Sequence, residues 1–174
     1  MKPNVIFTAF ANPQGDLVNL TEEQNGIQDV LLPLERQGKI EKHLVRTDTD
    51  MLAYFEFLRE YRDKISIFHY GGHADSKGIS LQNAHIFFEP LAKELIQRNP
   101  NALQLVVLNG CCTRPHLKTL FDLGVKAVIA TSVKVNDRTA TQFAIRFYKN
   151  LAGGDTIESA YNSAANFAKG NSTG

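Results

Sequence analysis

Short apolar segments alternate with segments of helical periodicity along most of the chain, and this alternation limits the possible folds more than any other feature. The most apolar run covers 103–108, and similar runs cover 5–10, 65–70 and 125–130. Between these runs, apolar residues recur every three or four positions, which is typical of amphipathic helices. Strands that alternate with helices build a mainly parallel sheet. The pattern therefore predicts an α/β fold with a mainly parallel central sheet and helices on both faces.

A second group of signals marks turns and helix starts. Two alternating runs around a polar turn at 82–84 predict a β-hairpin. Residues 21–24 (TEEQ) fit a capping box at the start of a helix, and Pro33 predicts a kink or a restart further along it. Asn136 is expected to cap another helix, with the carboxylate of Asp137 in its first turn.

Composition places the chain among ordinary globular proteins. It has 174 residues, of which 43% are hydrophobic and 21% are charged, as expected for one folded domain. The formal net charge of +1 argues against binding to nucleic acid or to an anionic membrane surface. The apolar runs are shorter than a signal peptide or a membrane span requires, so we expect a cytoplasmic protein. The domain is expected to cover 1–169, with 170–174 as a tail or the start of a linker in a longer multidomain protein.

The two cysteines, Cys111 and Cys112, are neighbours. Adjacent cysteines cannot join distant parts of a chain, so a disulfide framework is excluded and a reducing compartment is favoured. The cysteines follow the apolar run 103–108, whereas the run 65–70 leads into a glycine pair and His73. Because parallel strands end at the same edge of a sheet, we expect His73 and Cys111 to lie there together. A thiol beside an imidazole is the minimum for covalent acyl transfer.

Other thiol chemistry fits the sequence less well. A tyrosine-phosphatase loop needs an arginine six positions after its cysteine, but Leu117 and Lys118 stand there. The CxxC motif of thioredoxins and a glycine-rich phosphate loop are both missing. A metal site would have to gather side chains without any recognised ligand spacing, namely His69, His73, Cys111, Cys112 and His116. We therefore expect neither a metal nor a cofactor.

The remaining polar residues near these loops are interpreted as structural. His69 lies within its strand and is expected to be packed and hydrogen-bonded. Asp75 is expected to be a turn residue, and Cys112 to pack away from the site as a small apolar side chain. The other histidines have no partner pattern and are expected at the surface: His43, His85 and His116.

The segments IFHYGGHAD, LQLVVLNGCCT and LGVKAVIATSVKVNDRTATQFAIRFYKNLAGGDTIESAYNSAANFA resemble the CHAT domain, a caspase-like cysteine peptidase family related to separase. The resemblance covers nearly the whole chain and implies a caspase–haemoglobinase-like three-layer sandwich. It makes His73 the acid/base and Cys111 the nucleophile of a His–Cys dyad. It also implies that the backbone N–H groups of Ala74 and Cys111 hold the oxyanion. Ala74 stands where the family usually has glycine.

The resemblance extends to substrate binding. It implies that Asn109 lines the pocket for the side chain before the cut. The segment Thr131, Ser132 and Val133 is expected to pair with an extended substrate through main-chain hydrogen bonds. The implied function is a cysteine endopeptidase acting on a protein or peptide. It would be the effector domain of a larger prokaryotic signalling or defence protein, switched on by sensor or repeat domains. The alternative is a catalytically silent binding or regulatory module, favoured by Ala74 and by the missing acid at position 109.

Overall fold

The computed structural model describes residues 4–131 and 135–171, and it confirms the predicted α/β fold. Five parallel strands form the central sheet in the order β2-β1-β3-β6-β7. They are β1 (Val5–Ala11), β2 (Lys42–Arg46), β3 (Ile65–Gly72), β6 (Leu105–Asn109) and β7 (Ala127–Ala130).

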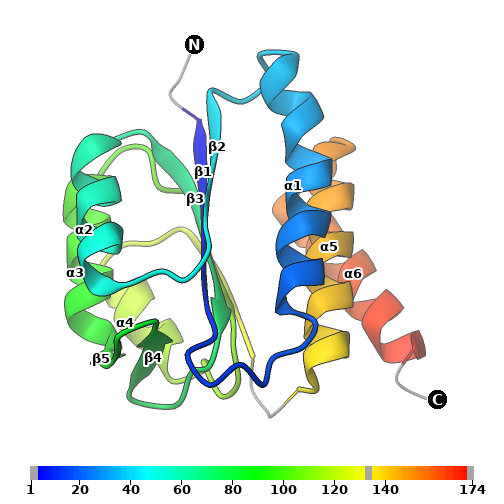
Figure 1. The fold of residues 1–174 in the computed structure, drawn as a ribbon. Coiled ribbons are helices and arrows are strands. Elements are labelled where there is room, and N and C mark those ends of the chain that lie inside the picture. Colours follow the sequence, from blue (N-terminus) through cyan, green and yellow to red (C-terminus); the bar gives the residue numbers. More distant parts are fainter. Residues whose placement is uncertain (1–3, 132–134, 172–174) are drawn as a thin grey trace.

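Helices cover both faces of this sheet, so the domain has three layers (Figure 1). One face carries α1 (Leu20–Arg36), α5 (Asp137–Ala152) and α6 (Ile157–Asn171). The other carries α2 (Met51–Glu60), α3 (Phe88–Arg98) and α4 (His116–Asp122). Among the described residues, no helix is both long and apolar enough to cross a membrane.

Side chains of each central strand alternate between the two helical layers. Phe7 of β1 packs in the core beneath α2 and α3, whereas its neighbours Ile6 and Phe10 pack in the core beneath α1 and α5. In the same way, Val106 and Val107 of β6 belong to opposite cores. Burial on both faces explains why these strands are continuous apolar runs rather than alternating ones.

The predicted hairpin is present as β4 (Gly78–Leu81) and β5 (Ala84–Phe87), which pair antiparallel. It folds back onto the loop that follows β3. Ser80 N donates to His73 O at 2.8 Å, and Asp75 N donates to Gly78 O at 3.0 Å. Hairpin and loop therefore form one connected unit at the carboxyl edge of the sheet.

Two predictions about α1 are wrong, whereas the cap of α5 is confirmed. The helix begins after Asn19 instead of at a capping box, because the Asn19 side chain donates to the carboxylate of Asp137. The helix also does not restart at Pro33, which lies in its last turn and whose carbonyl oxygen still accepts from Gln37. Asn136 accepts from the backbone N–H of Thr139 at 2.7 Å, as predicted for a helix cap.

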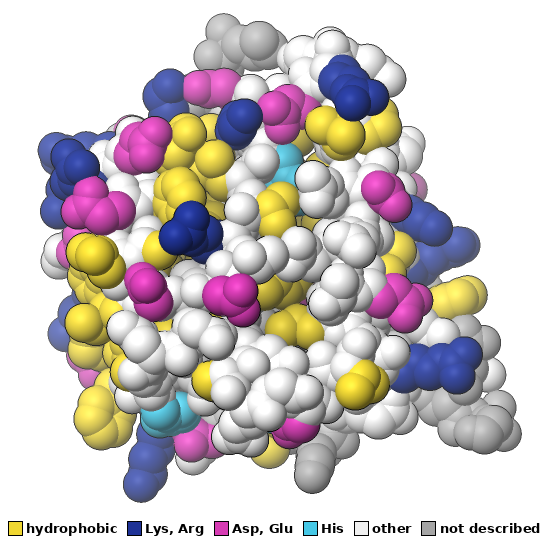
Figure 2. All heavy atoms as spheres, in the orientation of Figure 1, with side chains coloured by type: hydrophobic (Ala, Val, Ile, Leu, Met, Phe, Trp, Pro, Cys, Tyr) yellow, Lys and Arg dark blue, Asp and Glu magenta, His cyan; other side chains and the backbone are white. Residues whose placement is uncertain are grey.

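The two charge types are mixed over the molecular surface. Figure 2 shows Lys and Arg interspersed with Asp and Glu on the face at the β2 edge of the sheet. Neither sign gathers in a large patch there, in keeping with the net charge of +1.

The predicted surface position of His43 is wrong. His43 lies on β2 under the end of α1, where its backbone N–H donates to Glu35 at 2.9 Å. Its buried Nε2 lies 3.0 Å from Thr8 Oγ1, and this hydroxyl donates in turn to Leu44 O. Burial lowers the pKa of His43 to about 4, although the Glu35 charge opposes the shift.

The free energy of unfolding should therefore fall as the pH drops from about 6.5 towards 4. In this range His43 is protonated in the unfolded chain but stays neutral in the folded protein. His43 accounts for up to about 3 kcal/mol of this pH-dependent fall in unfolding free energy, and we expect the His43→Gln variant to lack that contribution. Urea unfolding at pH 7.5, 6 and 5 measures it. His85→Gln, at an exposed histidine, is the control. Equal pH slopes for wild type and His43→Gln would contradict the assignment.

Candidate active site

The loops that carry His73 and Cys111 leave neighbouring strands at the same edge of the sheet. In the parallel register of β3 and β6, Gly71 pairs with Asn109. His73 and Cys111 each follow two residues later, so the two loops lie side by side as expected.

The two loops touch at Gly110, which has no side chain. A Cβ on Gly110 would lie 2.7 Å from Gly72 O and 2.9 Å from Ala74 Cβ. A Cβ on Gly72 would lie 2.6 Å from Ala11 O. All three distances are too short for a real Cβ, so glycine is needed at position 110 to bring the two loops together and at position 72 to keep the start of the His73 loop against β1.

Cys111 is half-buried, and its loop is held in place by two threonines. Its Sγ lies 3.8 Å from the carbonyl oxygen of Val135. Thr113 Oγ1 donates to Leu108 O at 3.1 Å, and Thr131 Oγ1 donates to Gly110 O. Cys111 is therefore partly exposed, while the backbone of its loop is fixed.

Cys112 does not pack into the interior, contrary to our expectation. It is exposed and has a φ of 55°. Because this left-handed conformation turns the chain sharply, the two neighbouring thiols have different environments.

The backbone N–H groups of Ala74 and Cys111 donate no hydrogen bond to any residue in 4–131 or 135–171. Ala74 forms an isolated bridge with Ile79, but the two hydrogen bonds of that bridge use His73 O and Asp75 N. Among the described residues, these two backbone donors therefore have no acceptor.

Asp16, which sequence reasoning missed, contacts His73. Its Oδ1 lies 2.7 Å from His73 Nε2, and the exposed fractions of the two side chains are 54% and 28%. This hydrogen bond holds the pKa of Asp16 below its ordinary value. The available sequence signal was that Asp16 follows the apolar run 5–10, whose strand ends at the same sheet edge; the structure shows that this strand neighbours β3.

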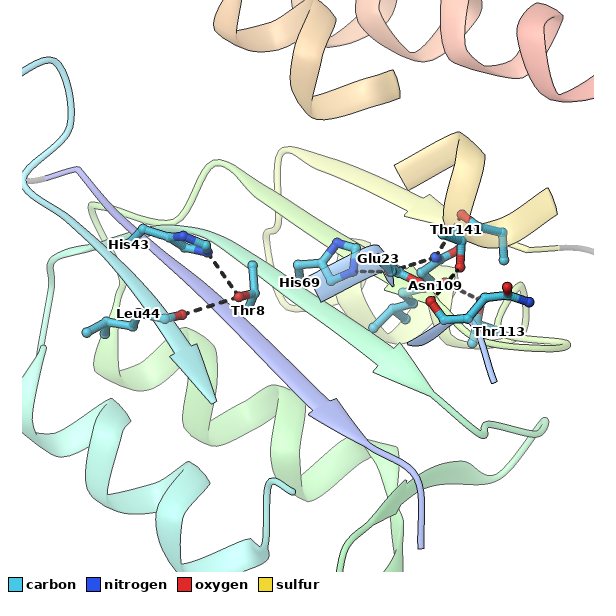
Figure 3. A network of polar contacts seen from close by, with 11 residues as sticks. Thr8, Glu23, His43, Leu44, His69, Asn109, Thr113 and Thr141 are labelled. Atoms are coloured by element: carbon cyan, nitrogen blue, oxygen red, sulfur yellow. Dashed lines mark hydrogen bonds and ion pairs between the residues drawn. The ribbon is translucent and has the colours of Figure 1, made fainter. Parts of the chain in front are cut away.

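A buried polar network lies behind the two loops (Figure 3). The Glu23 carboxylate of α1 is 2% exposed and lies 2.8 Å from His69 Nε2. The same oxygen accepts from Asn109 Nδ2 at 2.9 Å, and this amide group also donates to Ala140 O. His69 is therefore packed and hydrogen-bonded, as predicted. Glu23 had no distinguishing sequence signal, since it resembled a capping residue.

His116 is buried rather than at the surface, so that prediction is wrong. Its Nε2 donates to Asp75 O at 2.8 Å, and its ring lies 4.3 Å from that of Phe88. Burial lowers the pKa of His116. Asp75 is a turn residue as predicted, since its carboxylate accepts from Lys77 N and Gly78 N. His116 therefore joins the start of α4 to the loop that carries His73.

The residues predicted to bind the substrate differ in their surroundings. The Asn109 side chain is buried in the network described above. Thr131 has its backbone N–H bonded to Thr113 and its carbonyl oxygen bonded to Arg114. Ser132 and Val133 lie outside the described residues. Within the described residues, no three His, Cys, Asp or Glu side chains gather as metal ligands.

The open parallel sheet, with helices on both faces and with the His73 and Cys111 loops at its carboxyl edge, is consistent with a caspase-like α/β sandwich. The family model for the CHAT domain matches residues 2–168. The chain therefore belongs to the CHAT domain family, as the sequence resemblance indicated. A comparison with curated protein sequences gives no match.

Removal of the Glu23 carboxylate should destabilise the domain strongly, because His69 and Asn109 would be left buried without their partner. We expect Glu23→Ala to lower the free energy of unfolding by about 3–5 kcal/mol. The exposed neighbour Glu22 provides the control, with an expected change within about 0.5 kcal/mol for Glu22→Ala. Urea denaturation measures both. Similar values for the two variants would show that the network contributes little.

Substitution of Gly110 should force the two loops apart. A methyl group there meets Gly72 O and Ala74 Cβ, so we expect Gly110→Ala to cost about 1–3 kcal/mol of stability. Gly170→Ala is the control, because its added Cβ meets no described atom within 4 Å. Unfolding in urea compares the two. A Gly110→Ala protein as stable as wild type would contradict the close contact.

Proposed function

We propose that this domain is a cysteine endopeptidase in which Cys111 is the nucleophile and His73 transfers the proton. The observation that carries the proposal is the direct contact of the two loops at Gly110, in a chain of the CHAT family. The partial exposure of both side chains supports it, since each must reach a substrate.

The proposed reaction proceeds through an acyl-enzyme. The Cys111 thiol gives its proton to the His73 imidazole, and the thiolate attacks the carbonyl carbon of the scissile peptide bond. The backbone N–H groups of Ala74 and Cys111 bind the oxyanion that forms. When the C–N bond breaks, His73 returns the proton to the leaving amine and a thioester remains. Water, deprotonated by His73, then hydrolyses the thioester and frees the thiol.

The contacts around the site refine the proposed substrate-binding residues. Because the Asn109 amide is bonded to Glu23 and Ala140 O, we propose that it fixes the Cys111 loop and does not select the substrate side chain. The backbone of Thr131 is likewise occupied. We therefore propose that Thr131 does not itself pair with the main chain of an extended protein or peptide substrate.

The wider setting follows from the family and is part of the proposal. We propose that the domain acts in the cytoplasm as the effector of a larger prokaryotic signalling or defence protein. Sensor or repeat domains, in the same chain or in a partner, would then control its activity.

A catalytically silent regulatory module is the second candidate, and Ala74 favours it. Alanine restricts the backbone more than the usual glycine does. Its N–H is retained, however, and donates to no described residue, so the substitution alone does not remove the oxyanion site.

Labelling with peptide acyloxymethyl ketones separates the two candidates, because these reagents alkylate an active-site thiol. We expect Cys111→Ala to abolish labelling and Cys112→Ala to retain it. His73→Ala should slow it at least about a hundredfold, as expected for the loss of an acid/base group. Intact-protein mass spectrometry gives the rates.

The matched pair of adjacent cysteines makes the outcome decisive. Labelling that persists in Cys111→Ala but not in Cys112→Ala would show that the nucleophile is Cys112. The reagents should carry a diverse set of peptides and be tested on the full-length protein as well as on the domain. If none of them labels the wild type, the domain is a catalytically silent regulatory module.

A further inference from the structure

We propose that Asp16 is a positioning residue that orients the His73 imidazole towards Cys111. The proposal rests on the proposed function and adds a third side chain to the His–Cys pair. It begins from the 2.7 Å contact between Asp16 Oδ1 and His73 Nε2.

This contact determines which nitrogen of the His73 ring is unprotonated and can accept a proton. A carboxylate only accepts hydrogen bonds, so Nε2 carries the proton that it donates to Asp16. In the neutral ring, Nδ1 is then the unprotonated nitrogen. It has no hydrogen bond to a described residue, and we assign to it the uptake of the thiol proton. A hydrogen bond to one ring nitrogen commonly fixes the tautomer and the orientation of the ring in this way.

The loop before α1 presents Asp16 in a defined position. The Asn12 side chain closes the loop, since Nδ2 donates to Leu17 O and Oδ1 accepts from Leu17 N. Gly15 N donates to Asn12 O at 3.0 Å, which forms a tight turn just before Asp16. Leu17 packs against the core beneath α1 and α5. The carboxylate is therefore held between two anchored residues.

The other end of this loop is attached to the elements that hold the site. Asn19 donates to the Asp137 carboxylate at the start of α5 through both its backbone N–H and its side chain, at 2.7 Å and 3.0 Å. One turn further along α1, Glu23 binds Asn109, which precedes the Cys111 loop. The Asp16 loop and the Cys111 loop are thus tied to the same helix.

The exposure of Asp16 separates a positioning role from a structural one. An exposed ion pair contributes little to stability because water competes for both partners. Removal of Asp16 should therefore leave folding nearly unchanged. A positioning role predicts instead that thiol reactivity falls, because the ring loses its fixed orientation.

The test uses a probe that does not require peptide turnover. Alkylation of Cys111 by iodoacetamide is followed by mass spectrometry at pH 7, with every variant made in the Cys112→Ala background. We expect Asp16→Ala to slow alkylation about tenfold and Asp16→Glu to restore most of the rate. The thermal midpoint should stay within about 2 °C of wild type. Asp29→Ala, at an exposed carboxylate of α1, is the control and should change nothing.

The His73→Ala variant distinguishes failure of this proposal from failure of the proposed function. If His73→Ala slows alkylation and Asp16→Ala does not, the role of Asp16 is overturned and the Cys111–His73 pair stands. If neither variant changes the rate, the pair itself is wrong and the role of Asp16 falls with it. If Asp16→Ala slows the reaction but Asp16→Glu gives no rescue, or the thermal midpoint falls in parallel, the effect is structural and the proposal is again overturned.

Discussion

The buried carboxylate of Glu23 is the interaction on which the arrangement of the site depends. A charge removed from water is costly unless it is paired and hydrogen-bonded, and Glu23 meets this condition with His69 and Asn109. Its partners come from β3 and β6, the strands whose loops carry His73 and Cys111. One carboxylate from α1 therefore fixes both strands just before they end, and their relative register determines where the two loops begin.

From these strand ends, close backbone contact and a few side-chain bonds fix the loops. Gly110 lets the two loops approach closely, and the β4–β5 hairpin is hydrogen-bonded to the His73 loop. His116 then joins the two, since it begins the helix after the Cys111 loop and binds Asp75 O. The residues that hold the two loops are thus buried, whereas His73 and Cys111 are partly exposed, an arrangement that suits a pre-organised site.

Much of the fold and part of the site were predictable from sequence, because they depend on local pattern. The apolar runs predicted β1, β3, β6 and β7 of the central sheet, the polar turn predicted the β4–β5 hairpin, and Asn136 marked the start of α5. The strand–helix alternation predicted parallel pairing, which brings His73 and Cys111 to the same edge. The family motifs led to the CHAT domain, to which the chain belongs.

The sequence by itself determined the layered α/β fold, the family and the two loops at one edge of the sheet, because periodicity and short motifs are properties of neighbouring residues. Only the tertiary structure decided that Asp16 meets His73, that Glu23 lies between His69 and Asn109, and that His43 and His116 are buried. Each of these contacts joins residues far apart in the chain, and it exists only once helices pack on the sheet. Local sequence pattern gives no information on which distant side chains will meet in the folded protein. From sequence alone, Glu23 therefore looks like a residue of a helix cap, and Asp16 looks like an ordinary turn residue.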